Sequence, residues 1–171
     1  LIYMAYNVTN PATLTSLSNT IQNKMVSSNT VPGFISIDQE GGRVVRLTNG
    51  GTHFISQMAM GATGNYNNTY LEGNAVGKEL ISYGINMDLT PVLDVNNNPD
   101  NPIIGIRSYS DNPIFVSLYG DNMVKGLKSA KGYIRKSLAN EIELRHIPEL
   151  EFIYDESIEY GKKIEEKIKE I

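Results

Sequence analysis

The feature that most constrains the fold is a threefold alternation of short apolar runs with helical patterns. The runs are rich in the branched and aromatic residues that favour strands, and they lie at residues 1–6, 34–37 and 85–90. Apolar residues at helical spacing lie between or after them, at residues 11–25, 70–83 and 114–128. This order is typical of parallel βα units. We therefore expect an α/β fold with parallel strands.

Cap residues support the limits of two of these helices. Asn10-Pro11 places a proline in the first turn of the helix at 11–25, where its missing N–H is not needed. Gly84 follows the helix at 70–83 as a C-cap residue. On that second helix, the spacing predicts one buried side, formed by Leu71, Ala75, Val76, Leu80 and Ile81.

Composition excludes several classes of protein. The chain has 171 residues, 40% of them apolar and 20% charged, which is ordinary for a globular domain. A net charge of −4 gives no electrostatic reason to bind nucleic acid or an anionic membrane, and no apolar run approaches the roughly 18 residues of a membrane span. There is no cysteine, which excludes disulfides and cysteine-ligated zinc. We expect a cytoplasmic protein with no cofactor and no metal.

The two ends of the chain differ in character. The chain opens on a strand pattern with no basic and apolar leader before it, as a fragment of a longer protein would. Up to Gly132 it is rich in Asn, Gly, Thr and Pro and holds 8 Lys and Arg against 9 Asp and Glu. The last 39 residues hold 7 against 10, with almost no Gly or Asn. This shift suggests two segments of different origin, although a helical tail on one domain would also produce it.

Polar residues gather after the second and third strand patterns, at the ends where parallel α/β folds carry their functional loops. Asp38 suits sugar binding because one carboxylate can accept hydrogen bonds from two adjacent hydroxyls. Arg46 and Arg107 are forked donors for hydroxyl, carbonyl or carboxylate oxygens. The alternative is structural, with Asp38 pairing with an arginine only to hold the end of its strand.

Three stretches carry a resemblance to a known family. Residues 32–46 are Pro-Gly-Phe-Ile-Ser-Ile-Asp-Gln-Glu-Gly-Gly-Arg-Val-Val-Arg, residues 84–95 are Gly-Ile-Asn-Met-Asp-Leu-Thr-Pro-Val-Leu-Asp-Val, and residues 98–109 are Asn-Pro-Asp-Asn-Pro-Ile-Ile-Gly-Ile-Arg-Ser-Tyr. In order and spacing they resemble glycoside hydrolase family three, and within it the bacterial β-N-acetylglucosaminidases. The resemblance covers about residues 1–131 and implies part of a (β/α) barrel.

By this resemblance, Asp38, Arg46 and Arg107 match residues that contact the substrate sugar, which implies an N-acetylglucosamine-containing saccharide as ligand. Asp94 is expected to support the loop beneath the site. Ile106 departs from the family, which usually has an acidic residue there, and this changes the expected setting of Arg107.

The resemblance also shows what is missing. The family cleaves glycosides in two steps with retention, using a nucleophilic aspartate and a histidine acid/base that follows a Lys-His-Phe-Pro-Gly-His-Gly stretch. This chain has no such stretch, and no aspartate matches the nucleophile. His53 lies between the family's motifs and His146 lies in an unrelated Arg-His-Ile-Pro context, so both are expected to be structural or solvated. We predict no catalytic residue.

The end of the chain resembles a second family. Residues 133–150 are Tyr-Ile-Arg-Lys-Ser-Leu-Ala-Asn-Glu-Ile-Glu-Leu-Arg-His-Ile-Pro-Glu-Leu, and residues 151–161 are Glu-Phe-Ile-Tyr-Asp-Glu-Ser-Ile-Glu-Tyr-Gly. Over about residues 127–171 the chain is similar to the C-terminal part of ribosome-binding factor A, a KH-like protein, which implies a helix, a strand at 143–154 and a helix. We predict two domains, at 1–131 and 132–171. A chimera, a designed recombinant or a mis-assembled gene would each produce this junction.

These observations predict a partial barrel of parallel βα units with an appended helix–strand–helix, whose strand at 143–154 extends the open sheet. The leading function is a glycosidase lineage that is inactive in this chain and binds sugar weakly at best. One alternative is a ribosome-maturation or RNA-binding module, although a net charge of −3 after residue 132 disfavours a nucleic-acid partner. The other is a recombined chimera with no native function. Open sheet edges would allow homo-oligomers, and no membrane partner is expected.

Overall fold

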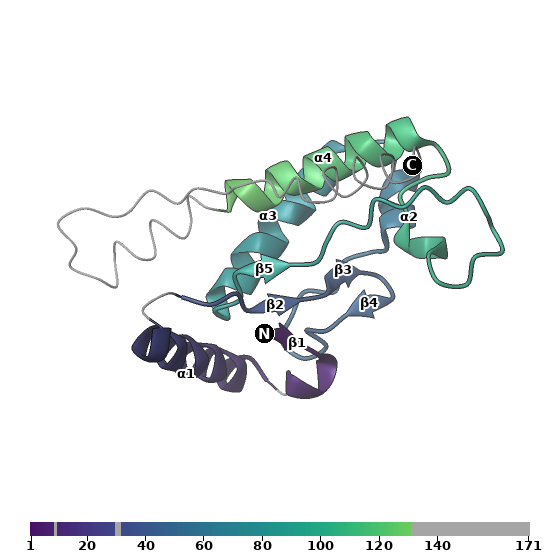
Figure 1. The fold of residues 1–171 in the computed structure, drawn as a ribbon. Coiled ribbons are helices and arrows are strands. Elements are labelled where there is room, and N and C mark those ends of the chain that lie inside the picture. Colours follow the sequence, from purple (N-terminus) through teal and green to yellow (C-terminus); the bar gives the residue numbers. More distant parts are fainter. Residues whose placement is uncertain (9, 30–31, 131–171) are drawn as a thin grey trace, which may run out of the picture.

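The structure is a computed structural model, and it describes residues 1–8, 10–29 and 32–130. The main elements follow the order of parallel βα units: β1 (Ile2–Tyr3), α1 (Pro11–Asn29), β2 (Ser36–Ile37), α3 (Asn67–Ser82), β5 (Met87–Asp88) and α4 (Pro113–Ser129). Figure 1 shows α1 on one side of the strands and α3 and α4 on the other. The predicted α/β class is confirmed.

The three strands form one parallel sheet in the order β1-β2-β5. Ile2 lies opposite Ser36, and Ile37 lies opposite Asp88. Within the described residues, β1 and β5 each pair only with β2, so this sheet is open at both edges. The strands are shorter than the predicted runs at 1–6 and 85–90, and β1 is followed at once by the 3-10 helix η1 (Ala5–Asn7).

The core lies between this sheet and the helices. Its central cluster is made of side chains from β1, β2, α1, α3, α4 and the adjoining loops: Tyr3, Val8, Leu14, Ile35, Ile37, Leu47, Val76, Leu80, Ile85 and Met123. A hydrogen bond of 3.1 Å between the hydroxyls of Tyr3 and Ser18 also joins β1 to α1. The strands that carry polar residues at their ends are therefore anchored in a packed core.

Helices α3 and α4 pack closely because glycines face the contact. A Cβ atom on Gly126 would lie 2.2 Å from the main-chain oxygen of Tyr70, so no side chain fits there. The buried residues of α3 are Thr69, Glu72, Gly73, Val76, Gly77 and Leu80. The prediction that Leu71 and Ala75 lie on the buried side was wrong, since Leu71 is 57% exposed and Ala75 is exposed. The helix turns its small residues toward α4, and this moves Leu71 outward.

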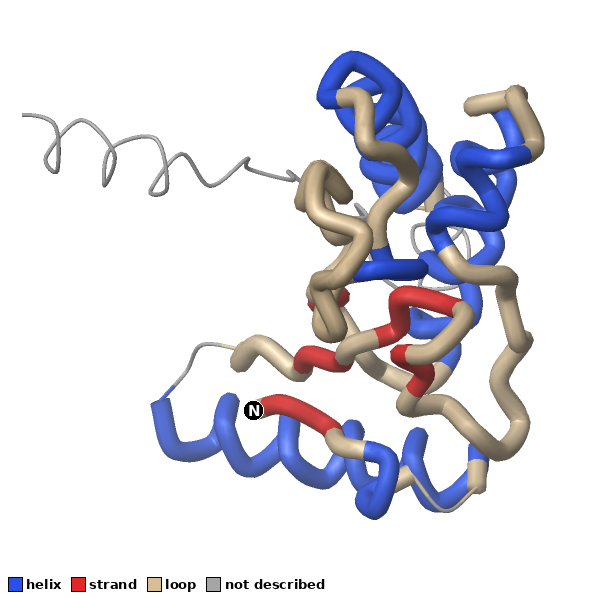
Figure 2. The backbone as a smooth tube through the Cα atoms, turned by 90° about the vertical axis from the view of Figure 1, so that its right-hand side faces the viewer, coloured by secondary structure: helices blue, strands red, loops and turns tan. Residues whose placement is uncertain are grey.

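The loop predicted after the second strand contains more structure than expected. A short antiparallel hairpin forms from β3 (Gln39–Gly41) and β4 (Val44–Val45), and α2 (Gln57–Ala62) follows. Ser56 caps α2, because its side chain accepts a hydrogen bond from the main-chain nitrogen of Ala59. A second 3-10 helix, η2 (Gly105–Arg107), lies in the loop before α4. Figure 2 shows the hairpin strands beside the loops that follow the sheet.

The predictions for residues 132–171, including the strand at 143–154 that extends the sheet, lie outside the described residues. Among the described helices, none combines the length and apolar character that crossing a membrane requires.

Candidate functional site

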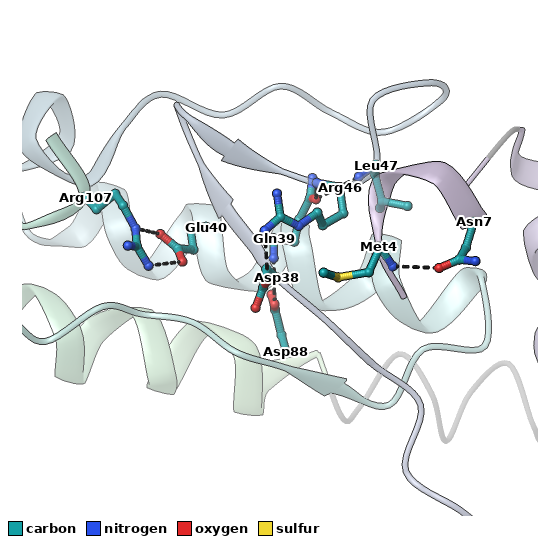
Figure 3. A network of polar contacts seen from close by, with 9 residues as sticks. All are labelled: Met4, Asn7, Asp38, Gln39, Glu40, Arg46, Leu47, Asp88 and Arg107. Atoms are coloured by element: carbon teal, nitrogen blue, oxygen red, sulfur yellow. Dashed lines mark hydrogen bonds and ion pairs between the residues drawn. The ribbon is translucent and has the colours of Figure 1, made fainter. Parts of the chain in front are cut away.

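Two neighbouring strands bring acidic residues to one end of the sheet. Asp38 follows β2 directly, and Asp88 is the last residue of β5, opposite Ile37 of β2. Because the two strands are parallel, both carboxyl ends lie at the same edge. Figure 3 shows Arg46 and Arg107 at this edge as well, so the three predicted binding residues lie along one edge of the sheet.

Asp38 and Arg46 form a direct ion pair. Arg46 donates from Nη2 to Oδ2 of Asp38 over 3.0 Å. The two side chains keep 22% and 29% of their surface exposed, for Asp38 and Arg46 respectively, so the pair remains accessible to a ligand. The geometry has the form of the structural alternative stated above. Within the described part of the chain, however, the other carboxylate oxygen of Asp38 has no hydrogen-bond partner, and it is free to accept a ligand hydroxyl.

Arg107 pairs with Glu40 and not with Asp38. Its Nε and Nη2 atoms donate to Oε2 and Oε1 of Glu40, each over 2.7 Å, in the bidentate arrangement that is among the strongest ion pairs in proteins. The Glu40 side chain is only 5% exposed. The hydrogen bond with Glu40 raises the pKa of Arg107, and the charges of Glu40, Asp94 and Asp38 act in the same direction. Arg107 is therefore within electrostatic reach of Asp38 without contacting it.

Three residues of this site were missed in the sequence: Gln39, Glu40 and Asp88. The Gln39 side chain is fully buried, and its Oε1 accepts hydrogen bonds from the main-chain nitrogens of Arg46 and Leu47, each at 3.0 Å. Asp88 accepts the main-chain N–H of Gln39 at its Oδ1, also at 3.0 Å. All three lie in the motif stretches, and this was the available signal. Pattern alone cannot tell which polar residue of such a stretch turns inward.

Two carboxyl groups near this edge have raised pKa values. Burial raises the pKa of Asp88 to about 7, the hydrogen bonds from the Gln39 and Leu89 main chain oppose this, and the charges of Asp38 and Glu40 add to it. Oδ2 of Asp88 is shielded from solvent and has no hydrogen-bond partner among the described residues. Burial likewise raises the pKa of Glu72, on α3, to about 7.

The turn between β3 and β4 requires its two glycines. Gly41 and Gly42 have φ angles of +86° and +57°, in the region that favours glycine. A Cβ atom on Gly42 would lie 2.6 Å from Cβ of Ser56, and one on Gly41 would lie 2.6 Å from the main-chain oxygen of Ile55. This tight turn returns the chain so that Arg46 can reach Asp38.

The remaining candidates have no direct part in these pairs. The main-chain oxygen of Asp94 accepts a hydrogen bond of 2.6 Å from the Ser108 hydroxyl, and the expected support of the loop by the Asp94 side chain stays a prediction. His53 is exposed, and His146 lies outside the described residues. A surface depression elsewhere contains none of the predicted binding side chains. It is lined by Met58, Asn96, Asn97, Pro99, Ser110 and Asp111. In the described ranges, no three His, Asp or Glu side chains are grouped so that they could hold a metal ion.

Comparison with known proteins identifies the family to which this chain belongs. The model of the glycosyl hydrolase family 3 N-terminal domain matches residues 1–143. The chain belongs to this family. The match includes every residue of the site described above and extends past the predicted boundary at residue 131.

The family 3 relatives include proteins named β-hexosaminidase and β-N-acetylglucosaminidase, and this confirms the predicted lineage. Beta-hexosaminidase A from Pseudoalteromonas piscicida is 44% identical over 135 residues, covering 75% of this chain and 22% of that protein. The solved structure of a family 3 β-N-acetylglucosaminidase from Paenibacillus sp. str. FPU-7 is also 44% identical, with a TM-score of 0.74 over 76% of this chain and 25% of that one. The chain thus spans about a quarter of the length of these relatives.

The second predicted resemblance is also found. Ribosome-binding factor A from Agathobacter rectalis is 38% identical over 88 residues, which cover 47% of this family 3 chain and 73% of the factor. The family of ribosome-binding factor A is therefore represented in the same chain. This agrees with the predicted chimera of two families, while the domain boundary at residues 131–132 stays a prediction.

Proposed function

We propose that this chain binds a terminal N-acetylglucosamine unit through Asp38, Arg46 and Arg107, and does not cleave it. The observation that carries the proposal is the row of two carboxylate–arginine pairs, Asp38–Arg46 and Glu40–Arg107, at the carboxyl edge of the parallel sheet. This edge is where parallel α/β folds bind their ligands. The relatives named after β-N-acetylglucosaminidase and β-hexosaminidase activity support this choice of sugar.

The paired groups suit a neutral sugar. Asp38 offers an unpaired carboxylate oxygen to a hydroxyl, and Arg46 offers guanidinium N–H groups that Asp38 does not occupy. Arg107 uses Nε and Nη2 for Glu40, and among the described residues its Nη1 atom has only a long contact of 3.4 Å, to the main-chain oxygen of Ile103. Nη1 can therefore turn to a hydroxyl or to an acetamido oxygen. Each pairing also holds its arginine in place before the ligand arrives, which lowers the entropic cost of binding.

Cleavage needs groups that the motif comparison does not find. A retaining glycosidase requires a nucleophilic carboxylate and an acid/base on the two sides of the glycosidic bond. Glu40 is committed to Arg107, and Asp38 is committed to Arg46. His53 is an exposed loop residue. Oδ2 of Asp88, the third carboxyl at this edge, is shielded from solvent. With Asp38 and Glu40 used in ion pairs and this oxygen of Asp88 shielded, the edge is suited to hold a sugar and not to attack it.

Ligand-observed NMR titration of the full 171-residue chain with N-acetylglucosamine tests this proposal. We expect weak, saturable binding, because a quarter-length chain forms only part of a pocket wall. Asp38→Asn should weaken it by about tenfold or more, since a hydrogen bond to a charged group contributes roughly 1.5–3 kcal/mol. The control is Asp121→Asn, which changes an exposed aspartate on α4 and should leave binding unchanged. Equal binding by all three proteins, or none by the wild type, would refute the proposal.

A second candidate function follows from the match to ribosome-binding factor A, which covers 73% of that protein. Under this alternative the chain binds ribosomes. The acidic balance after residue 132 disfavours contact with nucleic acid phosphates. Cosedimentation of the purified chain with ribosomes at low salt distinguishes the two candidates, because only the second predicts that the chain enters the ribosomal pellet.

A further inference from the structure

The two arginines of the candidate site are fixed in different ways. Arg107 forms a side-chain fork with Glu40, and its main-chain N–H donates to the main-chain oxygen of Ile104, whereas the main chain of Arg46 is held by a buried side chain. The Oε1 atom of Gln39 accepts the main-chain N–H groups of Arg46 and Leu47, each at 3.0 Å. Gln39 is only 2% exposed, so water cannot replace it as the acceptor of these two groups.

Gln39 is in turn held by the neighbouring strand. Its main-chain N–H donates to Oδ1 of Asp88 at the end of β5. This N–H belongs to the peptide that joins Asp38 to Gln39, so the bond fixes the main chain directly beside the Asp38 side chain. The ion pair from Arg46 back to Asp38 completes a closed ring of contacts, which Figure 3 shows. Gln39 closes the ring and Asp88 supports it through the Gln39 main chain, and neither residue has a role in the proposed binding.

We propose that Gln39 and Asp88 are positioning residues, which hold Asp38 and Arg46 in the geometry that binds sugar. The proposal rests on the proposed sugar binding and adds to it a reason for two buried polar side chains at this edge. Burying a polar side chain is costly unless its hydrogen bonds are made, so an apolar residue would serve packing better at both positions. In the ring, the polar groups of Gln39 and Asp88 orient Asp38 and Arg46, which lie outside the paired strands.

The charge of Asp88 gives this ring a dependence on pH. The charges nearest to Asp88 are those of Asp38 and Glu40, which are themselves paired with Arg46 and Arg107. Burial raises the pKa of Asp88 to about 7, so the group ionises near neutral pH. An ionised carboxylate accepts the Gln39 N–H in a charge-assisted bond, whereas the protonated form accepts it more weakly. The ring is therefore tighter, and sugar affinity higher, above pH 7 than below it.

Paired glutamine variants test the role of Gln39. Gln57 is the matched control, because it is 4% exposed and its amide also bonds main-chain groups, the N–H and the carbonyl of Val92. Both Gln39→Ala and Gln57→Ala should lower thermal stability. Only Gln39→Ala should weaken the binding of N-acetylglucosamine, by about fivefold or more, because it frees the main chain of Arg46. Equal losses of affinity in the two variants would mean a structural role alone and would overturn the proposal for Gln39.

The pH profile of binding tests the role of Asp88. For the wild type we expect an affinity for N-acetylglucosamine about three- to fivefold higher at pH 8 than at pH 6, as the charge-assisted bond forms. Asp88→Asn keeps a neutral acceptor and should bind at both pH values as the wild type does at pH 6. Glu72→Gln removes the other carboxyl with a pKa raised to about 7 and should keep the wild-type profile. A wild-type affinity that does not change with pH would overturn the proposal for Asp88, even if a variant fails to fold.

Asp38→Asn in the same titrations separates this proposal from the function on which it rests. Loss of binding in Asp38→Asn, with wild-type behaviour in Gln39→Ala and Asp88→Asn, would leave the sugar site standing and refute the positioning ring. Absence of binding in the wild type would refute both. Weaker binding at pH 8 in all three variants, with the affinity of Gln57→Ala unchanged, is the result that the ring predicts.

Discussion

Two ion pairs in this chain differ in geometry and in surroundings. Glu40 is 5% exposed and meets Arg107 through two hydrogen bonds, whereas Asp121 and Lys125 on α4 are both more than half exposed. Water and salt screen the surface pair, and its contribution to folding is small. The Glu40 carboxylate has little access to water, so removing its partner would leave a buried charge uncompensated.

Arg107→Ala should therefore lower the free energy of unfolding by about 3 kcal/mol, because it leaves the buried Glu40 carboxylate without a partner. Lys125→Ala is the matched surface variant and should change the free energy by less than about 0.5 kcal/mol. Urea denaturation at pH 7, followed by circular dichroism, measures both. A loss for Arg107→Ala as small as that for Lys125→Ala would show that Glu40 is satisfied in another way.

Glu72 makes stability depend on pH. Burial raises its pKa from 4.5 to about 7, so the folded chain binds more protons than the unfolded chain between these values. Stability is therefore fully present below about pH 4.5, falls as the pH rises, and levels off above about pH 7, with a total loss of about 3 kcal/mol from this group. Asp88 acts with the same sign, since its pKa is raised from 3.8 to about 7.

Glu72→Gln should reduce this fall in stability between pH 5 and pH 8, because the glutamine side chain does not ionise. Glu79→Gln on the same helix is the control, since Glu79 accepts hydrogen bonds from Thr52 at the surface. Urea midpoints across this pH range measure the effect. If the stability of Glu72→Gln falls as steeply as that of the wild type, Glu72 is not the group that titrates.

At the scale of elements, the contact between α3 and α4 depends on residues without side chains. Gly73 and Gly126 allow the main chains of the two helices to approach each other, and Gly77 lies beside the fully buried Ala130. A glycine inside a helix costs roughly 1 kcal/mol relative to alanine, so these positions need a packing reason. The close approach provides it.

Gly126→Ala should accordingly destabilise the chain although alanine favours helices. Its Cβ atom would lie 2.2 Å from the Tyr70 oxygen, and separating the two helices costs roughly 1–3 kcal/mol or more. The control is Ala75→Ser, an exposed change on α3, with an expected effect within about 0.5 kcal/mol. Thermal melts compare them. A higher melting temperature for Gly126→Ala would contradict the packing described here.

The sequence predicted the order of elements because strand and helix patterns are local. Asn10-Pro11 marked the start of α1, and Gly84, with a φ angle of +75°, follows α3 as expected of its C-cap glycine. The buried face of α3 was predicted in part, since Val76 and Leu80 are buried, and the rest was wrong because apolar spacing gives no weight to glycine. The pairing of Arg107 with Glu40 was missed for another reason, since 67 positions separate them and only the folded sheet brings them together.

At the scale of the whole molecule, this chain contains part of a family 3 domain and a segment similar to ribosome-binding factor A. A closed barrel has eight parallel strands, and the described sheet has three. The chain also spans only about a quarter of its family 3 relatives. The residues proposed to grip the sugar lie within this portion, whereas no match to the catalytic groups was found in the sequence.

The intact chain should therefore release no measurable nitrophenol from nitrophenyl N-acetyl-β-glucosaminide. Removing either the nucleophile or the acid/base lowers glycosidase rates by orders of magnitude, and here both are unmatched. A buffer blank and a denatured sample set the background. Turnover that disappears in Asp38→Ala or Arg107→Ala would show that other residues of this chain complete a catalytic site.

A crystal structure of the full chain soaked with N-acetylglucosamine tests the central claim most directly, because it shows where the sugar lies. The account predicts a pyranose ring at the carboxyl edge of β2 and β5, with a hydroxyl on the free oxygen of Asp38 and further oxygens on Arg46 and Arg107. A sugar bound elsewhere, without contact to the Asp38–Arg46 and Glu40–Arg107 pairs, would contradict it.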